Sequence, residues 1–501
     1  MAETKEDGKG GLSRRDFITA AAGVTVAAGA AKRAEAGVYK SILPSTVLGA
    51  NELIRTGHIG LGYSCQCRGG GIDELMFSIT TERFQPIMLC DTRRSNVEKR
   101  VKPMFREKTA DAVVVDDFRR VIENRDVDAV VVAMQDHWHC LPVLYAAEAK
   151  KAIYCRVPLC STLAEAHAMR KAIKDNGVVF QGGTVQRSGK HFLKAVEMVR
   201  NGCIGKVAWI ETFSLDNTYI NGIGMGETDA TKYTDKGLNW DMDQGWVEHK
   251  PFNLNRWINS CMYLDYSGGK IAGWGAHLMD IAMMAMGDDR QPNSVTAVGG
   301  KYLMQDSRTT PDTLEVLYRF DDFILSFTNR VWNPLTFDGK QPDHGIVFYG
   351  ERGILSVNRL GLDVFASKQN QTADKATVTE HIDPETPDQQ AALNLPHWQN
   401  FADSIRGIAK PNAPIDTLFN TTRICLIGSC AYVAGAHFNS GAKFDGTSMP
   451  DEAPAYGQTT LDWDAETQKF AGGNAETVKI ANNWAYREYQ NGWSLKAPHH
   501  A

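Results

Sequence analysis

Residues 128–142 read DAVVVAMQDHWHCLP, and this stretch decides the class of fold. Its first part, residues 129–134, is an apolar run that no polar residue interrupts. Runs of this kind, rich in β-branched residues, are typical of strands in a parallel sheet buried on both faces. The polar residues that follow then stand at the carboxyl edge of the sheet, where open α/β folds bind their ligands.

Strand and helix patterns alternate on both sides of this stretch. Helical patterns cover residues 118–123, 141–149 and 162–175. A short apolar strand ends in a glycine turn at Gly60, and further apolar runs follow at residues 86–90, 113–115, 152–155 and 178–180. This alternation predicts a doubly wound α/β domain over residues 54–180.

The pattern changes after residue 180. Longer strands with alternating apolar and polar residues begin at residue 207, as expected for an antiparallel sheet with one covered face. We therefore predict a second, α+β domain over residues 181–445, built on a large, open and mostly antiparallel sheet. The tail, residues 446–501, is rich in Gly, Pro, Thr and Asp, and is predicted to wrap the surface.

The N-terminus has the features of an export signal. Arg14 and Arg15 precede an apolar run over residues 18–31, and Ala34-Glu35-Ala36 offers a cleavage site. This order of features predicts a twin-arginine signal over residues 1–36 and a periplasmic or exported protein. No other apolar stretch is long enough to cross a membrane, so the mature chain is expected to have no membrane span.

Composition excludes two classes of protein. The 501 residues include 54 Lys and Arg against 59 Asp and Glu, a net charge of −5 that argues against a nucleic-acid partner. Ten cysteines are too few for a disulfide scaffold in a chain of this length.

Candidate residues for a dinucleotide site follow the predicted strands. Gly60 and Gly62 form the turn after the first strand, although Cys65 takes the place of the third glycine expected in such a loop. Asp91 ends the next strand, where a carboxylate holds a ribose hydroxyl in dinucleotide sites. Three further candidates for cofactor binding follow residues 129–134: Asp136, His137 and Trp138.

Residues 128–142, together with three other stretches, resemble one family. These stretches are QGGTVQRS at residues 181–188, WGAH at residues 274–277 followed by Asp280, and a tail from LDWD at residues 461–464 to Trp493-Ser494-Leu495. They resemble the Gfo/Idh/MocA oxidoreductases, especially the exported, twin-arginine branch.

The resemblance implies an N-terminal Rossmann domain that binds NAD(P) and a C-terminal domain whose open sheet mediates homo-oligomers. It also implies a small carbohydrate-type substrate, with a hydroxyl of a sugar, polyol or glycoside oxidised or reduced. Members of the family usually carry the proton and hydride chemistry with a lysine in Glu-Lys-Pro, an aspartate and a histidine. Because the twin-arginine route exports folded proteins, the cofactor is expected to be tightly bound.

This sequence departs from the family at the residues that carry the chemistry. Arg156-Val157-Pro158 stands in place of Glu-Lys-Pro, and Gly273 in place of the aspartate. His277 matches the catalytic histidine and is the first candidate general acid/base. His139 and Tyr154 are the further candidates to replace the missing lysine.

Three hypotheses about function remain open. The first is an NAD(P)-linked oxidoreductase with an atypical active site, and the second is a non-catalytic binding or scaffold protein on the same fold. The third is a metal or iron–sulfur site at the former nucleotide site, for which the candidate ligands are Cys65, Cys67, Cys90 and Cys155. A disulfide at Cys65 and Cys67 is an alternative to the metal.

Overall fold

The computed structural model confirms two sheets. It describes residues 53–61, 70–217, 221–236, 238–336, 343–366, 378–441 and 456–495. The predicted signal, residues 1–36, lies outside the described residues, and so do Gly62, Cys65 and Cys67. Among the described helices, none combines the length and the apolar character that crossing a membrane requires.

The first sheet is parallel and has the order β3-β2-β1-β4-β5-β6, that of a doubly wound dinucleotide-binding fold. β4 is fully buried, as its uninterrupted apolar run predicts. The strands are β1 (Ile54–Ile59), β2 (Phe84–Cys90), β3 (Val113–Val115), β4 (Ala129–Val132), β5 (Ala152–Cys155) and β6 (Phe180–Gly182). The main helices of this domain are α2 (Gly70–Thr80), α6 (Phe118–Glu123), α7 (Cys140–Glu148) and α8 (Leu163–Asn176).

The second sheet has ten strands and is antiparallel except where β7 pairs with β10. Its order is β14-β13-β12-β11-β7-β10-β9-β8-β15-β16. The strands are β7 (Val207–Leu215), β8 (Ser294–Gly300), β9 (Thr313–Arg319), β10 (Ile324–Arg330), β11 (His344–Gly350), β12 (Gly353–Asn358), β13 (Gly361–Ala366), β14 (Val378–Ile382), β15 (Tyr456–Asp464) and β16 (Lys469–Phe470).

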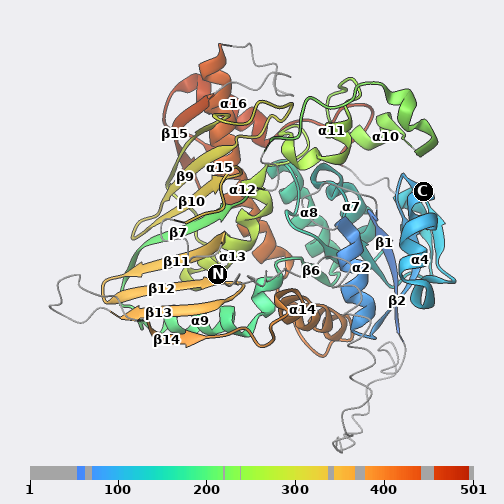
Figure 1. Cartoon of the computed structure of the whole chain (residues 1–501), viewed down its shortest axis with the longest axis horizontal. Coiled ribbons are helices and arrows are strands. Elements are labelled where there is room, and N and C mark those ends of the chain that lie inside the picture. The colour runs from blue at the N-terminus through green and yellow to red at the C-terminus, as the bar shows by residue number, and fades with distance from the viewer. Residues whose placement is uncertain are drawn as a thin grey trace, which may run out of the picture. The chain divides into compact units, whose positions relative to one another are not determined.

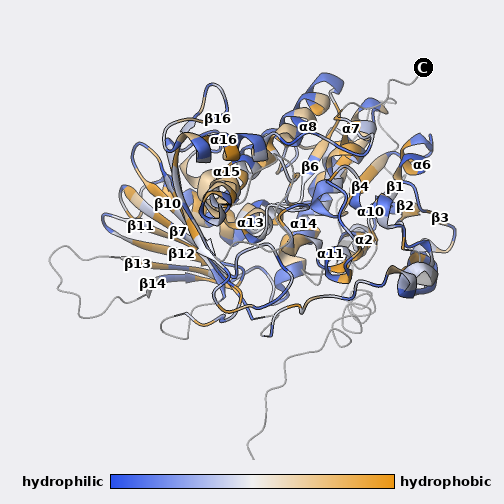
Figure 2. Ribbon diagram, turned by 90° about the horizontal axis from the view of Figure 1, so that it is seen from above, coloured by the Kyte–Doolittle hydropathy of each residue, from blue (hydrophilic) through white to orange (hydrophobic). Residues whose placement is uncertain are grey.

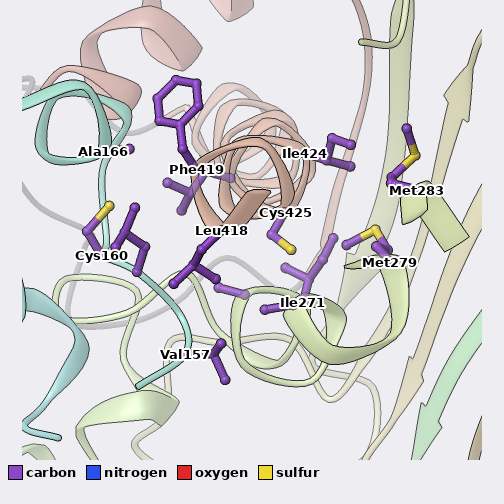
Figure 3. Packing of buried hydrophobic residues seen from close by; sticks show 14 of the residues in the cluster. Val157, Cys160, Ala166, Ile271, Met279, Met283, Leu418, Phe419, Ile424 and Cys425 are labelled. Carbon is purple, nitrogen blue, oxygen red and sulfur yellow. The ribbon is translucent and has the colours of Figure 1, made fainter. Parts of the chain in front are cut away.

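Two helices fill the space between the sheets. α15 (Ile415–Ser440) packs on β8 and β15, and α13 (Gly275–Met286) packs on β7 and β11 (Figures 1 and 2). α15 also contacts α8 and β6 of the first domain, and it is buried over nearly its whole length. Figure 3 shows side chains of both domains meeting around this helix, Val157 and Cys160 from one and Ile271 and Met279 from the other.

The described part of the second domain contains other long helices as well. They are α9 (Lys190–Arg200), α14 (Gln389–Ile405) and α16 (Ala475–Ala485). α14 begins before Pro396 because Asp388 caps it, its Oδ1 accepting hydrogen bonds from Gln390 N and Ala391 N. Pro396 therefore lies inside the helix.

The C-terminal tail is part of the second domain instead of a surface wrapping. β15 extends the large sheet beside β8, and α16 packs on α15 with Ile480 and Trp484 buried. The alternation of YGQTTLDWD, which buries Leu461 and Trp463 on one side, is the strand signal in this part of the sequence.

Candidate active site

A pocket lies at the carboxyl edge of the first sheet. It encloses about 580 Å³ of space that is partly open to solvent. Its walls come from the ends of β1, β2, β3 and β4 and from two short helices of the second domain, α10 (Trp240–Gln244) and α11 (Leu254–Ile258). The residues that line it are Ile59, Gly60, Cys90, Asp91, Thr92, Arg93, Asp116, Phe118, Met134, Gln135, Trp138, Met242, Asp243 and Trp257.

Two glycines bring the strand–helix turn close to the pocket. Gly60 has a φ of +95°, and a Cβ there would stand 2.5 Å from the carbonyl oxygen of Ala133. A Cβ at Gly71 would stand 2.3 Å from the carbonyl oxygen of Gly60, which accepts a hydrogen bond from Gly71 N. Gly71 therefore allows the close approach of helix to strand that the sequence analysis expected of the Cys65 position. In the sequence, the run Gly69-Gly70-Gly71 indicates this close approach of helix to strand.

Asp91 lies in the pocket, as its position after β2 predicts. Its Oδ1 accepts a hydrogen bond of 2.9 Å from Arg93 N. The guanidinium of Arg93 lies 4.7 Å from the ring centre of Trp257, so the first domain and α11 meet at this wall.

The segment Asp136–Trp138 docks the second domain onto the first. The carbonyl oxygen of Asp243 lies 3.1 Å from His137 Nε2 and accepts a 3.0 Å hydrogen bond from Trp138 Nε1. In return, Trp246 Nε1 donates a 2.6 Å hydrogen bond to the carbonyl oxygen of His137. Of the three residues predicted here as cofactor-binding, only Trp138 lines the pocket.

Burial shifts the ionisation of Asp136 and His137 in opposite ways. It raises the pKa of Asp136 to about 6, although a 2.5 Å hydrogen bond from Ser267 Oγ opposes the shift. It lowers the pKa of His137 to about 3, so this imidazole is neutral at physiological pH.

The His139 side chain holds two strand ends in position, and the Tyr154 side chain packs in the core. The Nδ1 of His139 lies 2.8 Å from the carbonyl oxygen of Pro158 and its Nε2 lies 3.1 Å from that of Met134, so the ring joins the ends of β4 and β5. Burial lowers the pKa of His139 to about 4. Tyr154 stacks on Trp398 at 4.2 Å and is 1% exposed. This packing argues against proton transfer by the Tyr154 hydroxyl.

His277 lies in the first turn of α13, half-buried beside the Trp274 ring. Val157 and Gly273, which stand at the family's lysine and aspartate positions, have different surroundings from each other. Val157 is 9% exposed and belongs to the apolar cluster around α15 (Figure 3). At Gly273, no described atom lies within 4 Å of the place where a Cβ would stand. The space for an aspartate is therefore present at residue 273, whereas residue 157 is part of the core.

The geometry of the sheet excludes a metal site that uses both Cys90 and Cys155. These residues end β2 and β5, which are separated by β1 and β4. At about 4.8 Å per strand they lie about 14 Å apart, too far to bind one ion or cluster. Among the described residues, no three His, Cys, Asp or Glu side chains form a group that could hold a metal.

Cys261 is disulfide-bonded. The other cysteines in the described part of the chain are free thiols: Cys90, Cys140, Cys155, Cys160, Cys203, Cys425 and Cys430. Cys65 and Cys67 are the cysteines of the sequence that lie outside the described residues. Peptide mapping without reduction is therefore expected to join the Cys261 peptide to the peptide that contains Cys65 and Cys67. Alkylation of Cys261 before any reduction would contradict this prediction.

Comparison with known proteins bears on the first domain most directly. Residues 54–184 match the family model of Gfo/Idh/MocA, described as an oxidoreductase family with an NAD-binding Rossmann fold. The likeness to this family therefore covers the first domain. Myo-inositol 2-dehydrogenase of Thermotoga maritima is 35% identical to this chain over 109 residues, which are 22% of this chain and 32% of that enzyme.

Other relatives extend the likeness without covering the whole chain. Levoglucosan dehydrogenase of Pseudarthrobacter phenanthrenivorans is 33% identical over 104 residues, 21% of this chain and 25% of that one. The matches therefore span about a third or less of the first curated relatives. A structure of levoglucosan dehydrogenase with NADH and levoglucosan aligns with 75% of this chain and 96% of its own, with a TM-score of 0.54 and 17% identity. This likeness supports the fold of both domains.

The second domain supplies a part of the pocket wall that no sequence motif indicates. Met242, Asp243 and Trp257 line the pocket, yet they are more than 100 residues away from Asp91 and Trp138 in the sequence. They lie on helices of five residues each, too short to show a hydrophobic period.

Proposed function

We propose that this protein is an NAD(P)-linked oxidoreductase that acts on a hydroxyl group of a sugar, polyol or glycoside. The observation that carries the proposal is the pocket at the switch point of the first sheet. Gly60 and Asp91 line it, and Gly71 allows the helix to approach the end of β1 closely. The relatives named above, which act on inositol and levoglucosan, support the substrate class.

The residues present fit the cofactor. Oδ2 of Asp243 is buried in the pocket wall and has no donor within hydrogen-bond distance among the described residues, although the Trp257 indole N–H faces the carboxyl, so it can accept a hydrogen bond from a ligand. Asp91 would hold a ribose hydroxyl, and Trp138 and Phe118 would exclude water from the apolar wall. When bound, NAD(P) supplies the hydride acceptor or donor of the reaction.

Side chains of this protein would carry out the proton transfer. His277 would accept the proton of the substrate hydroxyl at a ring nitrogen, the role of the histidine in the family that the sequence resembles. His139 would act as a positioning residue, because its ring joins the ends of β4 and β5.

Three further features belong to the proposal. Export by the twin-arginine route is supported by Arg14-Arg15 in the sequence and by the disulfide at Cys261, since disulfides persist mainly in oxidising compartments. Homo-oligomers through the second sheet are supported by Trp209 and Tyr349, which pair across β7 and β11 and are each 36% exposed. Tight retention of the cofactor is supported by the wall that α10 and α11 add.

A second candidate function is a non-catalytic binding or scaffold protein. Val157 favours it, because an apolar side chain in the core stands where the family places its lysine.

Turnover separates the two candidates. The purified protein, supplied with NAD⁺ and with myo-inositol, scyllo-inositol, levoglucosan and free sugars in turn, is expected to form NADH with at least one of these substrates. A protein that binds NAD⁺ but turns over no substrate in such a panel, in either direction, would contradict the enzyme and favour the scaffold.

A further inference from the structure

Asp243 is held firmly at the rim of the nucleotide pocket. Asn239 caps the start of α10, its side-chain oxygen accepting a hydrogen bond from Met242 N. The helix ends at Gly245, where a Cβ would stand 2.6 Å from the Trp138 ring. Together with the contacts of His137 and Trp138 to the Asp243 carbonyl oxygen, these features fix the backbone from which the carboxyl projects.

The two oxygens of the Asp243 carboxyl differ in their hydrogen bonding. Its Oδ1 accepts a 3.1 Å hydrogen bond from Thr92 Oγ1, next to Asp91. Its Oδ2 is buried and has no donor within hydrogen-bond distance in the described parts of the chain. The indole N–H of Trp257 faces the carboxyl and, as a hydrogen-bond donor, lowers its pKa. A buried carboxylate oxygen without a donor is costly, and a ligand hydroxyl at this place would remove the cost.

The charges around the pocket add a second observation. Three carboxylates line it, those of Asp91, Asp116 and Asp243, and Arg93 is the cation among the lining residues. Arg93 is already engaged with the Trp257 ring and with Asp91, from whose Oδ1 its Nε lies 3.8 Å. A phosphate group added to the ribose would therefore meet mainly negative charge.

We propose that Asp243 is a second acidic residue of the adenosine subsite, one that accepts a hydrogen bond from a ribose hydroxyl and selects NAD⁺ over NADP⁺. This inference rests on the proposed nucleotide site and assigns a role in it to a residue of the second domain. Asp91 at the end of β2 and Asp243 on α10 then bind the same sugar from the two domains, so the nucleotide would hold the domains together.

The selectivity is expected to depend on pH. Burial raises the pKa of Asp243 to about 7, and the nearby Asp91 carboxylate adds to the shift, while Arg93 and the donors Thr92 and Trp257 oppose it. Asp116 also lines the pocket, and His137, which is neutral here, contacts the Asp243 backbone. Above pH 7 the ionised Asp243 accepts from the ribose and repels a 2′-phosphate, whereas below pH 7 this repulsion fades.

The test is a titration of nucleotide-depleted protein with NAD⁺ and NADP⁺ at pH 6 and pH 8, followed by tryptophan fluorescence. Trp138 and Trp257 line the pocket and report binding without turnover. The wild type is expected to prefer NAD⁺ by about 100-fold at pH 8 and by less at pH 6. Asp243→Asn is expected to bind NAD⁺ about tenfold more weakly at pH 8 and to lose most of the change in preference with pH.

Asp241→Asn is the matched control, because Asp241 lies on the same helix with an 87% exposed side chain and is not among the lining residues. It is expected to behave as the wild type. Asp243→Ser serves as a second variant if the asparagine variant does not fold. Wild-type affinity and preference in the Asp243 variants would overturn the inference alone, whereas a wild type that binds neither nucleotide would overturn the proposed function.

Discussion

Replacing His277 by asparagine is expected to lower kcat by about 10²–10⁴-fold while leaving the affinity for NAD⁺ unchanged. Val157 and Gly273 replace the other two groups that carry the proton in the family, so little remains to compensate for the loss of the imidazole. Asparagine has a similar size and suits the half-buried position in the first turn of α13. The measurement is steady-state turnover of the best substrate, with nucleotide titration alongside.

His381→Asn is the control for this variant. His381 lies on β14, is half exposed, and pairs with Asp363 and Asp383 away from the pocket. It is expected to leave turnover unchanged. Full activity of the His277 variant would show that another group of the chain accepts the proton.

Replacing Arg187 by methionine is expected to destabilise the protein by about 3–5 kcal/mol. Arg187 is buried, and its Nε donates a 2.7 Å hydrogen bond to Asp280 Oδ2, while its other end pairs with Asp288. Asp280 is fully buried and would keep only the hydrogen bond from Thr421 Oγ1. The network joins the short 3-10 helix Val185–Ser188 to α13 and α15, so its loss weakens the packing of these helices within the second domain. Chemical denaturation measures the effect.

The pH dependence of the lost stability tests whether the unpaired Asp280 carboxyl causes it. Burial already raises the pKa of Asp280 against the opposing effect of Arg187, and removal of Arg187 raises it further. A carboxyl whose pKa is raised in the folded state favours folding when protonated, so the destabilisation is expected to grow as pH rises from 5 to 8. Arg94→Met, which breaks an exposed pair with Glu98, is expected to cost less than about 1 kcal/mol. An equal loss in the two variants would contradict the role of burial.

The first sheet could be predicted from the sequence because burial on both faces leaves a continuous apolar run. β4 and β5 are nearly fully buried, and the runs at residues 129–134 and 152–155 locate both. The face that each side chain occupies was harder to predict. Ile153 and Cys155 pack on one side of β5 and Tyr154 on the other, against Trp398, and this packing argues against Tyr154 as a proton-transfer residue.

The pocket could be predicted only in part. Asp91 and Trp138 follow strands, and the edge of a parallel sheet is a general place for ligands. Asp243 and Trp257 also line the pocket, but they belong to a segment without a clear hydrophobic period. Tertiary folding brings this segment to the pocket, and no local sequence pattern indicates its position. Gly71 was missed because the glycine loop was expected to end at the Cys65 position, although the helix begins at Gly70.

The nucleotide content of the purified protein tests the central claim most directly. Denaturation of the protein, followed by chromatography of the released small molecules, is expected to yield about one NAD(H) per chain, and the depleted protein is expected to rebind NAD⁺. A correctly folded protein that releases no nucleotide and shows no binding at saturating NAD⁺ would contradict the claim that this pocket is a dinucleotide site.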